Sequence, residues 1–181
     1  MTLPNFITIA RFVLVPVIIL AMINDEMMIA FVLFLLAGVS DGVDGFIARQ
    51  FNQRSELGTW LDPIADKVLL VSVFVMLGWL NVLPNWLVLL AVSRDTLIIG
   101  AVVLSSLMDQ PVAMRPLFIS KANTTAQILL IVLILAELAG IAEFGAVTVW
   151  MIYITAGLTI ASASAYLVTW LRHMAGNGET G

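Results

Sequence analysis

The chain contains 181 residues, of which 61% are hydrophobic and only 11% are charged, and its formal net charge is −4. This composition provides too little charge to cover the surface of a soluble domain of this length, and it excludes a basic nucleic-acid-binding surface. Because the chain has no cysteine and a single histidine, disulfide frameworks, thiolate metal sites and histidine-rich metal sites are excluded as well.

Long apolar blocks predict an all-α, polytopic membrane protein with six transmembrane helices. A helix needs about 20 apolar residues to cross the hydrocarbon core of a bilayer. The predicted spans are residues 5–23, 28–50, 59–80, 84–108, 120–141 and 146–171. We expect residues 1–172 to form one membrane domain and residues 173–181 to form a flexible C-terminal tail. No basic segment precedes the first block, which therefore predicts a retained helix and not a signal peptide.

Polar and turn-forming residues mark the breaks between the spans. In chain order, the breaks contain Asp25 and Glu26; residues 52–56; Asn81 and Pro84; residues 109–116; and Gly140, Glu143 and Gly145. Each of these groups interrupts an apolar block with residues that favour turns.

Basic residues predict the orientation of the spans. Arg49 and Arg54 lie at the second break, Arg115 and Lys121 lie at the fourth, and Arg172 follows the last span. The other breaks contain no Lys or Arg. The positive-inside rule then places both termini and the basic loops in the cytoplasm. Because no organelle-targeting segment precedes the first span, we expect a multi-pass protein of the bacterial inner membrane.

The first predicted span carries polar residues on one face. Asn5, Thr8 and Arg11 follow one another at i, i+3 spacing, so a helix brings their side chains together. They are candidates for contact with a lipid phosphate. Alternatively, Arg11 extends along the helix to reach the membrane interface.

Four aspartates lie inside the second and third predicted spans. Asp41 and Asp44 have i, i+3 spacing and Asp62 and Asp66 have i, i+4 spacing, so each pair shares a helical face. Each central charge costs about 2.5–3.5 kcal/mol to insert into a membrane, so cations are expected among these carboxylates. Both pairs lie toward the same cytoplasmic end. Because hard divalent cations prefer oxygen ligands, the sequence predicts a site for Mg²⁺, Mn²⁺ or Ca²⁺.

An alternative is that the aspartates form structural salt bridges with Arg49, Lys67 and Arg94. Asp95 adds a fifth acid, so these three cations cannot neutralise the whole set. The membrane insertion cost therefore favours a metal site over salt bridges alone.

Small residues lie close to the aspartates. Gly45 and Ala48 share the face of Asp41 and Asp44, and Gly58 lies at the start of the third predicted span. Such residues allow close helix packing, and they would also admit a bulky polar ligand. Arg49 lies one turn beyond Gly45 and can bind phosphate oxygens in a bidentate manner.

The stretch DGVDGFIARQFNQRSELGTWLDPIAD, from Asp41 to Asp66, resembles the signature of the CDP-alcohol phosphatidyltransferases. All of its defining positions are present at the family spacing. They are Asp41, Asp44, Gly45, Ala48, Arg49, Gly58, Asp62 and Asp66.

This resemblance implies six membrane helices around a polar cavity open to the cytoplasm, and a homodimer. It implies two divalent cations, Mg²⁺ or Mn²⁺, held by Asp41, Asp44, Asp62 and Asp66. It also implies transfer of a phosphatidyl group from CDP-diacylglycerol to an alcohol, with CMP as the leaving group and Asp66 as the general base. The residues that would shape the CDP-lipid site are Asp41, Asp44, Gly45, Ala48, Arg49 and Gly58.

Other segments are similar to one branch of the family, which holds the phosphatidylglycerophosphate synthases and the eukaryotic-type cardiolipin synthases. LPNFITIARFVLVP and LDPIADKVLL resemble both, whereas SRDTLIIGA, FISKANTTAQ and ASASAYLVTW look more like the cardiolipin synthases. This similarity favours phosphatidylglycerol as the acceptor and cardiolipin as the product. Glycerol 3-phosphate is the alternative acceptor.

Basic residues of the later spans are candidates for the acceptor site. Arg94, Arg115 and Lys121 could hold an acceptor phosphate, although ordinary positive-inside topology also accounts for such residues. Arg94 is the most informative of the three, because it lies within a span.

Two functions from other classes remain open at this point. A small cation transporter would use the aspartates as an ion relay, and a membrane scaffold would use them for packing alone. The transporter gives no reason for Gly45, Arg49 and Gly58 at their spacings, and the scaffold explains none of these residues.

Overall fold

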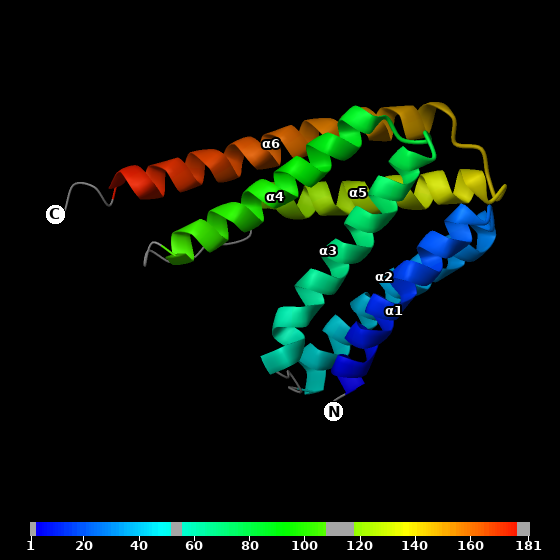
Figure 1. The fold of residues 1–181 in the computed structure, drawn as a ribbon, viewed down its shortest axis with the longest axis horizontal. Helices are drawn as coiled ribbons and strands as arrows, with labels where there is room; N and C mark the ends of the chain where they lie inside the picture. Colours follow the sequence, from blue (N-terminus) through cyan, green and yellow to red (C-terminus); the bar gives the residue numbers. More distant parts are fainter. Residues whose placement is uncertain (1–2, 52–55, 108–117, 177–181) are drawn as a thin grey trace. The chain divides into compact units, whose positions relative to one another are not determined.

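In the computed structural model, helices joined by turns form the whole of the described chain. The structure describes the backbone of residues 3–51, 56–107 and 118–176, and the side chains of residues 10–40, 64–100 and 118–171. The helices are α1 Leu3–Ile23, α2 Met27–Phe51, α3 Glu56–Trp79, α4 Asn85–Leu107, α5 Phe118–Leu138 and α6 Ala146–Gly176 (Figure 1). The all-α prediction is therefore confirmed over these ranges.

The helix boundaries lie within a few residues of the predicted spans. The largest difference is at the C-terminal end, where α6 continues to Gly176, into the segment assigned to a polar tail. The predicted loop at residues 109–116 lies outside the described residues. Length of the apolar blocks was thus a reliable guide to where each helix begins and ends.

Three of the predicted turns share one hydrogen-bonding pattern. Asp25, Asn81 and Gly140 follow α1, α3 and α5, and their φ angles are 62°, 58° and 70°. At each turn, the N–H of this residue donates to the carbonyl three residues earlier, and the next N–H donates to the carbonyl five residues earlier. This is the Schellman arrangement, which satisfies the last carbonyls of a helix. Asp, Asn and Gly occupy the left-handed position because they adopt it at lowest cost.

A carboxylate closes the turn between α5 and α6. Glu137 Oε1 accepts hydrogen bonds from the backbone N–H of Phe144 at 2.7 Å and of Gly145 at 2.8 Å. These groups directly precede α6, where a helix has unsatisfied N–H donors and a partial positive charge. One side chain of α5 therefore holds the start of the following segment.

Glu137→Ala is expected to lower the free energy of unfolding by about 1–3 kcal/mol, because two backbone N–H groups lose a charged acceptor. The measurement is chemical or thermal unfolding of the detergent-solubilised protein. Glu143→Ala is the matched control, since Glu143 is an exposed acid of the same turn. Equal stability of the two variants would contradict the assigned role of Glu137.

The chain divides into two compact units, which are described separately. Unit 1 comprises Met1–Leu83 and Ile131–Gly145, and unit 2 comprises Pro84–Leu130 and Ala146–Gly181. In unit 1, α1 packs against both α2 and α3. In unit 2, α4 packs against α6. Unit 1 thus contains both helices that carry the aspartate pairs, and unit 2 contains Arg94 and Asp95.

Buried apolar residues recur at helical spacing on the packed faces. The most deeply buried side chains of unit 1 include Ile18 and Met22 of α1 and Val73 and Leu77 of α3. In each pair, the residues are four positions apart, as expected for one face of a helix. Helix packing in unit 1 therefore follows the ordinary apolar stripe.

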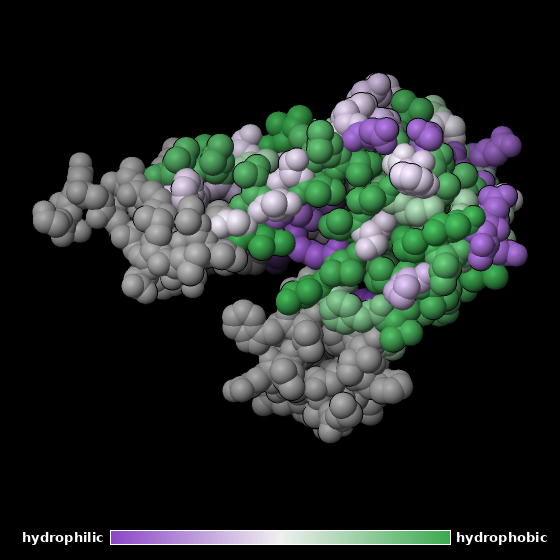
Figure 2. Space-filling model, in the orientation of Figure 1, coloured by the Kyte–Doolittle hydropathy of each residue, from purple (hydrophilic) through white to green (hydrophobic). Residues whose placement is uncertain are grey.

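Apolar side chains are also exposed along every described helix. Leu89, Trp150 and Val39 are examples, with exposed fractions of 69%, 68% and 61%. Figure 2 shows hydrophobic residues over most of the described surface in that view. Soluble monomers rarely expose apolar surface on this scale. Among the described residues, Phe118–Leu138 and Ala146–Leu171 are helices long and apolar enough to cross a bilayer.

Candidate active site

The two aspartate pairs lie on continuous helices of unit 1. Helix α2 runs without interruption through Asp41 and Asp44, and α3 runs through Asp62 and Asp66. Both helices pack against α1. The helical spacing predicted for each pair is thus present in the backbone. Of the four side chains, that of Asp66 is described, and convergence of all four carboxylates remains a prediction.

The other residues predicted for the CDP-lipid site also lie on these helices. Gly45, Ala48 and Arg49 belong to α2, and Gly58 belongs to α3. Asn5 and Thr8 belong to α1. The side chains of these residues lie outside the described part of the chain, and Arg115 lies outside the described residues altogether. Their roles therefore stay predictions.

Asp66 forms an ion pair with Arg11. Arg11 Nη1 donates a hydrogen bond to Asp66 Oδ1, which links α1 to α3 inside unit 1. The Arg11 side chain is only 3% exposed, whereas that of Asp66 is 45% exposed. Arg11 thus lies buried against Asp66 and does not extend to the surface.

Burial explains why this pair forms. Moving an isolated charge from water into a protein interior costs several kcal/mol, and an opposite charge with hydrogen bonds offsets that cost. The planar guanidinium of arginine suits a carboxylate especially well. The buried Arg11 therefore requires an anion, and Asp66 provides one.

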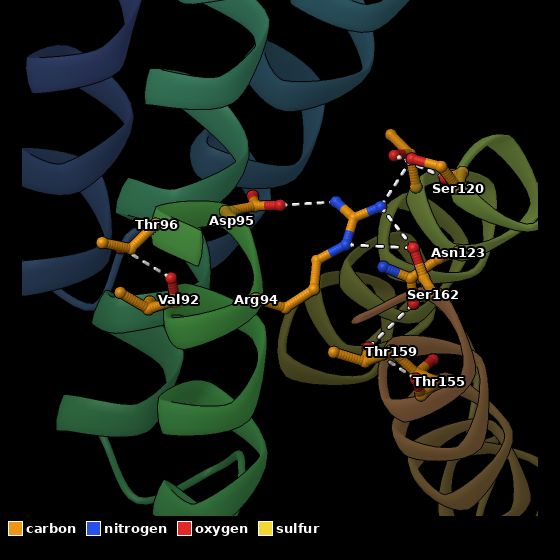
Figure 3. A network of polar contacts seen from close by, with 10 residues as sticks. Val92, Arg94, Asp95, Thr96, Ser120, Asn123, Thr155, Thr159 and Ser162 are labelled. Atoms are coloured by element: carbon orange, nitrogen blue, oxygen red, sulfur yellow. Dashed lines mark hydrogen bonds and ion pairs between the residues drawn. The ribbon is translucent and has the colours of Figure 1, made fainter. Parts of the chain in front are cut away.

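A second polar site lies in unit 2 around Arg94, which is buried on α4. Arg94 Nη1 donates to Asp95 Oδ1 at 2.5 Å, and Nη2 donates to Ser120 Oγ of α5 at 2.5 Å and to Ser162 Oγ of α6 at 2.7 Å (Figure 3). The Arg94 Cζ atom also lies 5.9 Å from the ring centroid of Tyr166, within the range of a cation–π contact. One side chain therefore connects α4, α5 and α6.

A layer of buried polar residues continues beside Arg94. The Thr159 hydroxyl lies 2.8 Å from Asn123 Oδ1 and 2.7 Å from the carbonyl of Thr155, and it can donate to either (Figure 3). Asn123 Nδ2 and Thr155 Oγ1 are buried without a hydrogen-bond partner among the described residues. Such atoms are costly in an apolar interior unless a water or a ligand completes them.

The contacts of Arg94 stabilise its buried charge. Asp95 neutralises the guanidinium, and two serines accept its other hydrogen bonds. An acceptor phosphate would have to share Arg94 with these partners. Lys121, the neighbour of Ser120 on α5, is exposed instead. The structure thus separates two residues that the sequence placed in one class: Arg94 lies in a buried network and Lys121 lies at the surface.

The partners of Arg94 were not among the residues predicted from the sequence. Ser120 and Asn123 are three residues apart on α5, and Thr155, Thr159 and Ser162 follow i, i+4, i+7 spacing on α6. Polar residues repeated at helical spacing inside apolar helices indicate interhelical hydrogen bonds. That pattern was available from the sequence. It did not reveal that both polar faces meet one arginine.

The donor set of unit 1 fits hard divalent cations. Asp41, Asp44, Asp62 and Asp66 would offer only carboxylate oxygens, which suit Mg²⁺ and Mn²⁺, and the chain has no cysteine to favour softer metals. The residues whose side chains are described contain no cluster of three or more metal-binding groups. The assignment therefore rests on the chemistry of the donors.

Known proteins match this chain closely. The family model of CDP-alcohol phosphatidyltransferase matches residues 1–161. The human cardiolipin synthase (CMP-forming) is 37% identical over 151 residues, which are 75% of this chain and 50% of that protein. The chain thus spans about half the length of that relative.

Two bacterial relatives match over most of both chains. The CDP-diacylglycerol–glycerol-3-phosphate 3-phosphatidyltransferase of Rickettsia felis is 35% identical over 91% of this chain and 92% of its own length. The probable phosphatidylglycerophosphate synthase of Mycobacterium tuberculosis is 30% identical over 98% and 86%. Because the family model covers residues 1–161, which include the whole Asp41–Asp66 motif, the chain belongs to the CDP-alcohol phosphatidyltransferase family.

Proposed function

We propose that this protein is a metal-dependent phosphatidyltransferase that converts CDP-diacylglycerol and phosphatidylglycerol into cardiolipin and CMP. The observation that carries the proposal is the complete Asp41–Asp66 motif, placed on two continuous helices of one unit. Similarity to the cardiolipin synthases supports phosphatidylglycerol as the acceptor. The motif also favours a transferase over the cation transporter, which leaves Gly45, Arg49 and Gly58 unexplained.

In this proposal, Asp41, Asp44, Asp62 and Asp66 hold two divalent cations. When bound, such cations stabilise the charge on the attacking and leaving oxygens of a displacement at phosphorus. Asp41 and Asp44, with Gly45, Ala48, Arg49 and Gly58, shape the site for the cytidine diphosphate group. The small residues admit the ligand, and Arg49 binds phosphate oxygens.

Asp66 acts as the general base. Its carboxylate takes the proton from the acceptor hydroxyl. The hydroxyl oxygen then bonds to the phosphorus that carries diacylglycerol, and the bond from that phosphorus to the oxygen of CMP breaks. CMP leaves with the electron pair of the broken bond. The described Asp66 side chain is partly exposed, as a group that must meet a substrate requires.

Basic and polar residues outside the motif are the candidates for the acceptor site. Arg94, Arg115 and Lys121 are candidates for the acceptor phosphate, and Asn5 and Thr8 are the candidates on α1 for lipid phosphate, whereas Arg11 is paired with Asp66. Asn123 Nδ2, which is buried with no hydrogen-bond partner in the described part of the chain, supports a polar ligand near Arg94. A ligand phosphate there would have to compete with Asp95 for the guanidinium.

Glycerol 3-phosphate is a second candidate acceptor. The relative from Rickettsia felis, whose name specifies that acceptor, aligns with this chain over 92% of its own length. The human cardiolipin synthase aligns over only 50% of its length. Similarity to the relative from Rickettsia felis therefore supports glycerol 3-phosphate, whereas the segments of α4, α5 and α6 support phosphatidylglycerol.

The protein is proposed to cross the bacterial inner membrane six times, as a homodimer. The exposed apolar side chains of all described helices support a lipid environment. The distribution of Arg and Lys between alternate loops supports cytoplasmic termini and a polar active-site cavity open to the cytoplasm.

The purified protein is expected to release CMP from CDP-diacylglycerol when Mg²⁺ or Mn²⁺ and phosphatidylglycerol are present, and to form cardiolipin. A parallel reaction contains glycerol 3-phosphate instead, and lipid products are separated by chromatography. Preferential use of glycerol 3-phosphate would show that this compound, and not phosphatidylglycerol, is the acceptor. Absence of CMP release with both acceptors would refute the proposed chemistry.

A chelated sample serves as the control for the metal. EDTA is expected to abolish transfer, and added Mg²⁺ or Mn²⁺ is expected to restore it, because the oxygen donors bind these ions and no softer ligand replaces them. Full activity after chelation would remove the cations from the mechanism.

A further inference from the structure

We propose that Arg11 is a positioning residue for Asp66, and that it acts on transfer through this carboxylate and not through a substrate phosphate. The inference rests on the proposed function, since it concerns the residue assigned as the base. It assigns Arg11 a role different from the lipid-phosphate contact suggested by its place beside Asn5 and Thr8.

The first support is the location of the pair. Arg11 of α1 and Asp66 of α3 lie in the same unit, on helices that pack directly against each other. Their hydrogen-bonded ion pair joins residues that are 55 positions apart in the chain. The carboxylate on α3 is therefore anchored by a neighbouring helix.

The second support is the difference in burial. Arg11 is almost fully buried, whereas nearly half of the Asp66 side chain is exposed. A buried guanidinium has few conformations, because packing holds its stem and its planar head binds carboxylates in a fixed geometry. The more exposed carboxylate of Asp66 accepts a hydrogen bond from this fixed group. The rigid member of the pair thus orients the accessible one.

The third support is the cost of the competing role. Arg11 Nη1 is held by Asp66, and only 3% of the Arg11 side chain is exposed. A substrate phosphate would have to reach this guanidinium in its buried position, where burying a second anion costs free energy. The buried position of Arg11 therefore favours the role beside Asp66.

Orientation matters for a general base, because the acceptor hydroxyl must lie within hydrogen-bond reach of the carboxylate. Small misplacements of a reacting group can reduce a rate by about 10²-fold. Arg11→Met is therefore expected to lower kcat for transfer by about 10²-fold while KM for CDP-diacylglycerol changes little. Arg11→Lys keeps the charge without the planar fork and is expected to restore part of that loss.

The decisive experiment is a double-mutant cycle with Asp66→Asn, followed by radiolabelled CMP release. If Arg11 acts through Asp66, Arg11→Met causes almost no additional loss in the Asp66→Asn background. An equal loss in both backgrounds, or a raised KM with unchanged kcat, would overturn the proposal. Val15→Ala is the control for packing, since Val15 is a buried apolar residue one turn further along α1. It is expected to keep kcat per folded molecule.

Thermal unfolding of the same four proteins separates this inference from the proposed function. If the ion pair stabilises the protein, the double variant should lower the melting temperature by less than the sum of the two single substitutions. This coupling is measurable whether or not the wild type transfers phosphatidyl groups. Coupling in an inactive wild type would refute the proposed function alone, and additive shifts would refute the pairing.

Discussion

Asp66→Asn is expected to reduce phosphatidyl transfer by about 10³-fold, within the range of 10²–10⁴ that a general base contributes. The amide has nearly the shape of the carboxylate, but it cannot accept the proton of the acceptor hydroxyl. Binding of CDP-diacylglycerol should largely persist, because the other aspartates remain on their helices. The measurement is the initial rate of CMP release at saturating lipid, together with equilibrium binding of labelled CDP-diacylglycerol.

Asp25→Asn is the matched control for this substitution. Asp25 is an exposed residue in the turn after α1, with a φ angle of 62°. Asparagine adopts this left-handed conformation readily, so the same chemical change is made without backbone strain. This variant should keep its activity. Full activity in Asp66→Asn would remove Asp66 from the role of base.

Arg94→Met is expected to destabilise the protein by about 3–5 kcal/mol, the usual cost of removing one member of a buried ion pair. The carboxylate of Asp95, whose side chain is only 9% exposed, would lose its charged partner. Ser120 and Ser162 would also lose the donor that joins α5 and α6 to α4. The free energy of unfolding in detergent is the measurement.

Two further variants test the cause of that loss. Arg94→Met combined with Asp95→Leu removes both charges and should recover much of the stability, because replacing a whole buried pair by apolar residues is often neutral or favourable. Lys121→Met removes an exposed charge from the neighbouring helix and should change stability by less than about 0.5 kcal/mol. A small effect of Arg94→Met would show that the network of unit 2 contributes little.

The same substitutions also test whether Arg94 binds the acceptor phosphate. If Arg94 only connects helices, the Arg94→Met and Asp95→Leu double variant should keep normal KM values for either acceptor. If Arg94 binds the acceptor phosphate, recovery of stability should leave a raised KM for that acceptor. Stability and substrate affinity together therefore separate the structural role of Arg94 from a binding role.

The sequence by itself determined the helices and several of their turns. Each apolar block is long enough to specify one helix, and Asp25, Asn81 and Gly140 favour the left-handed conformation that ends α1, α3 and α5. These are local properties, because helix hydrogen bonds and turn conformations involve residues within a few positions of each other. The motif from Asp41 to Asp66 is also short enough to be read directly, and it identified the family.

Only the tertiary structure decided which polar side chains meet. Arg11 was a candidate for lipid phosphate in the sequence, and its partner proved to be Asp66, 55 residues away. Arg94 was one of three similar basic residues, and packing brought it to Ser162, 68 residues away. Helical periodicity shows which residues share a face, but it does not show which other helix that face contacts. Which helix a face contacts depends on pairing the buried charges and burying the apolar surfaces of separate helices at the same time.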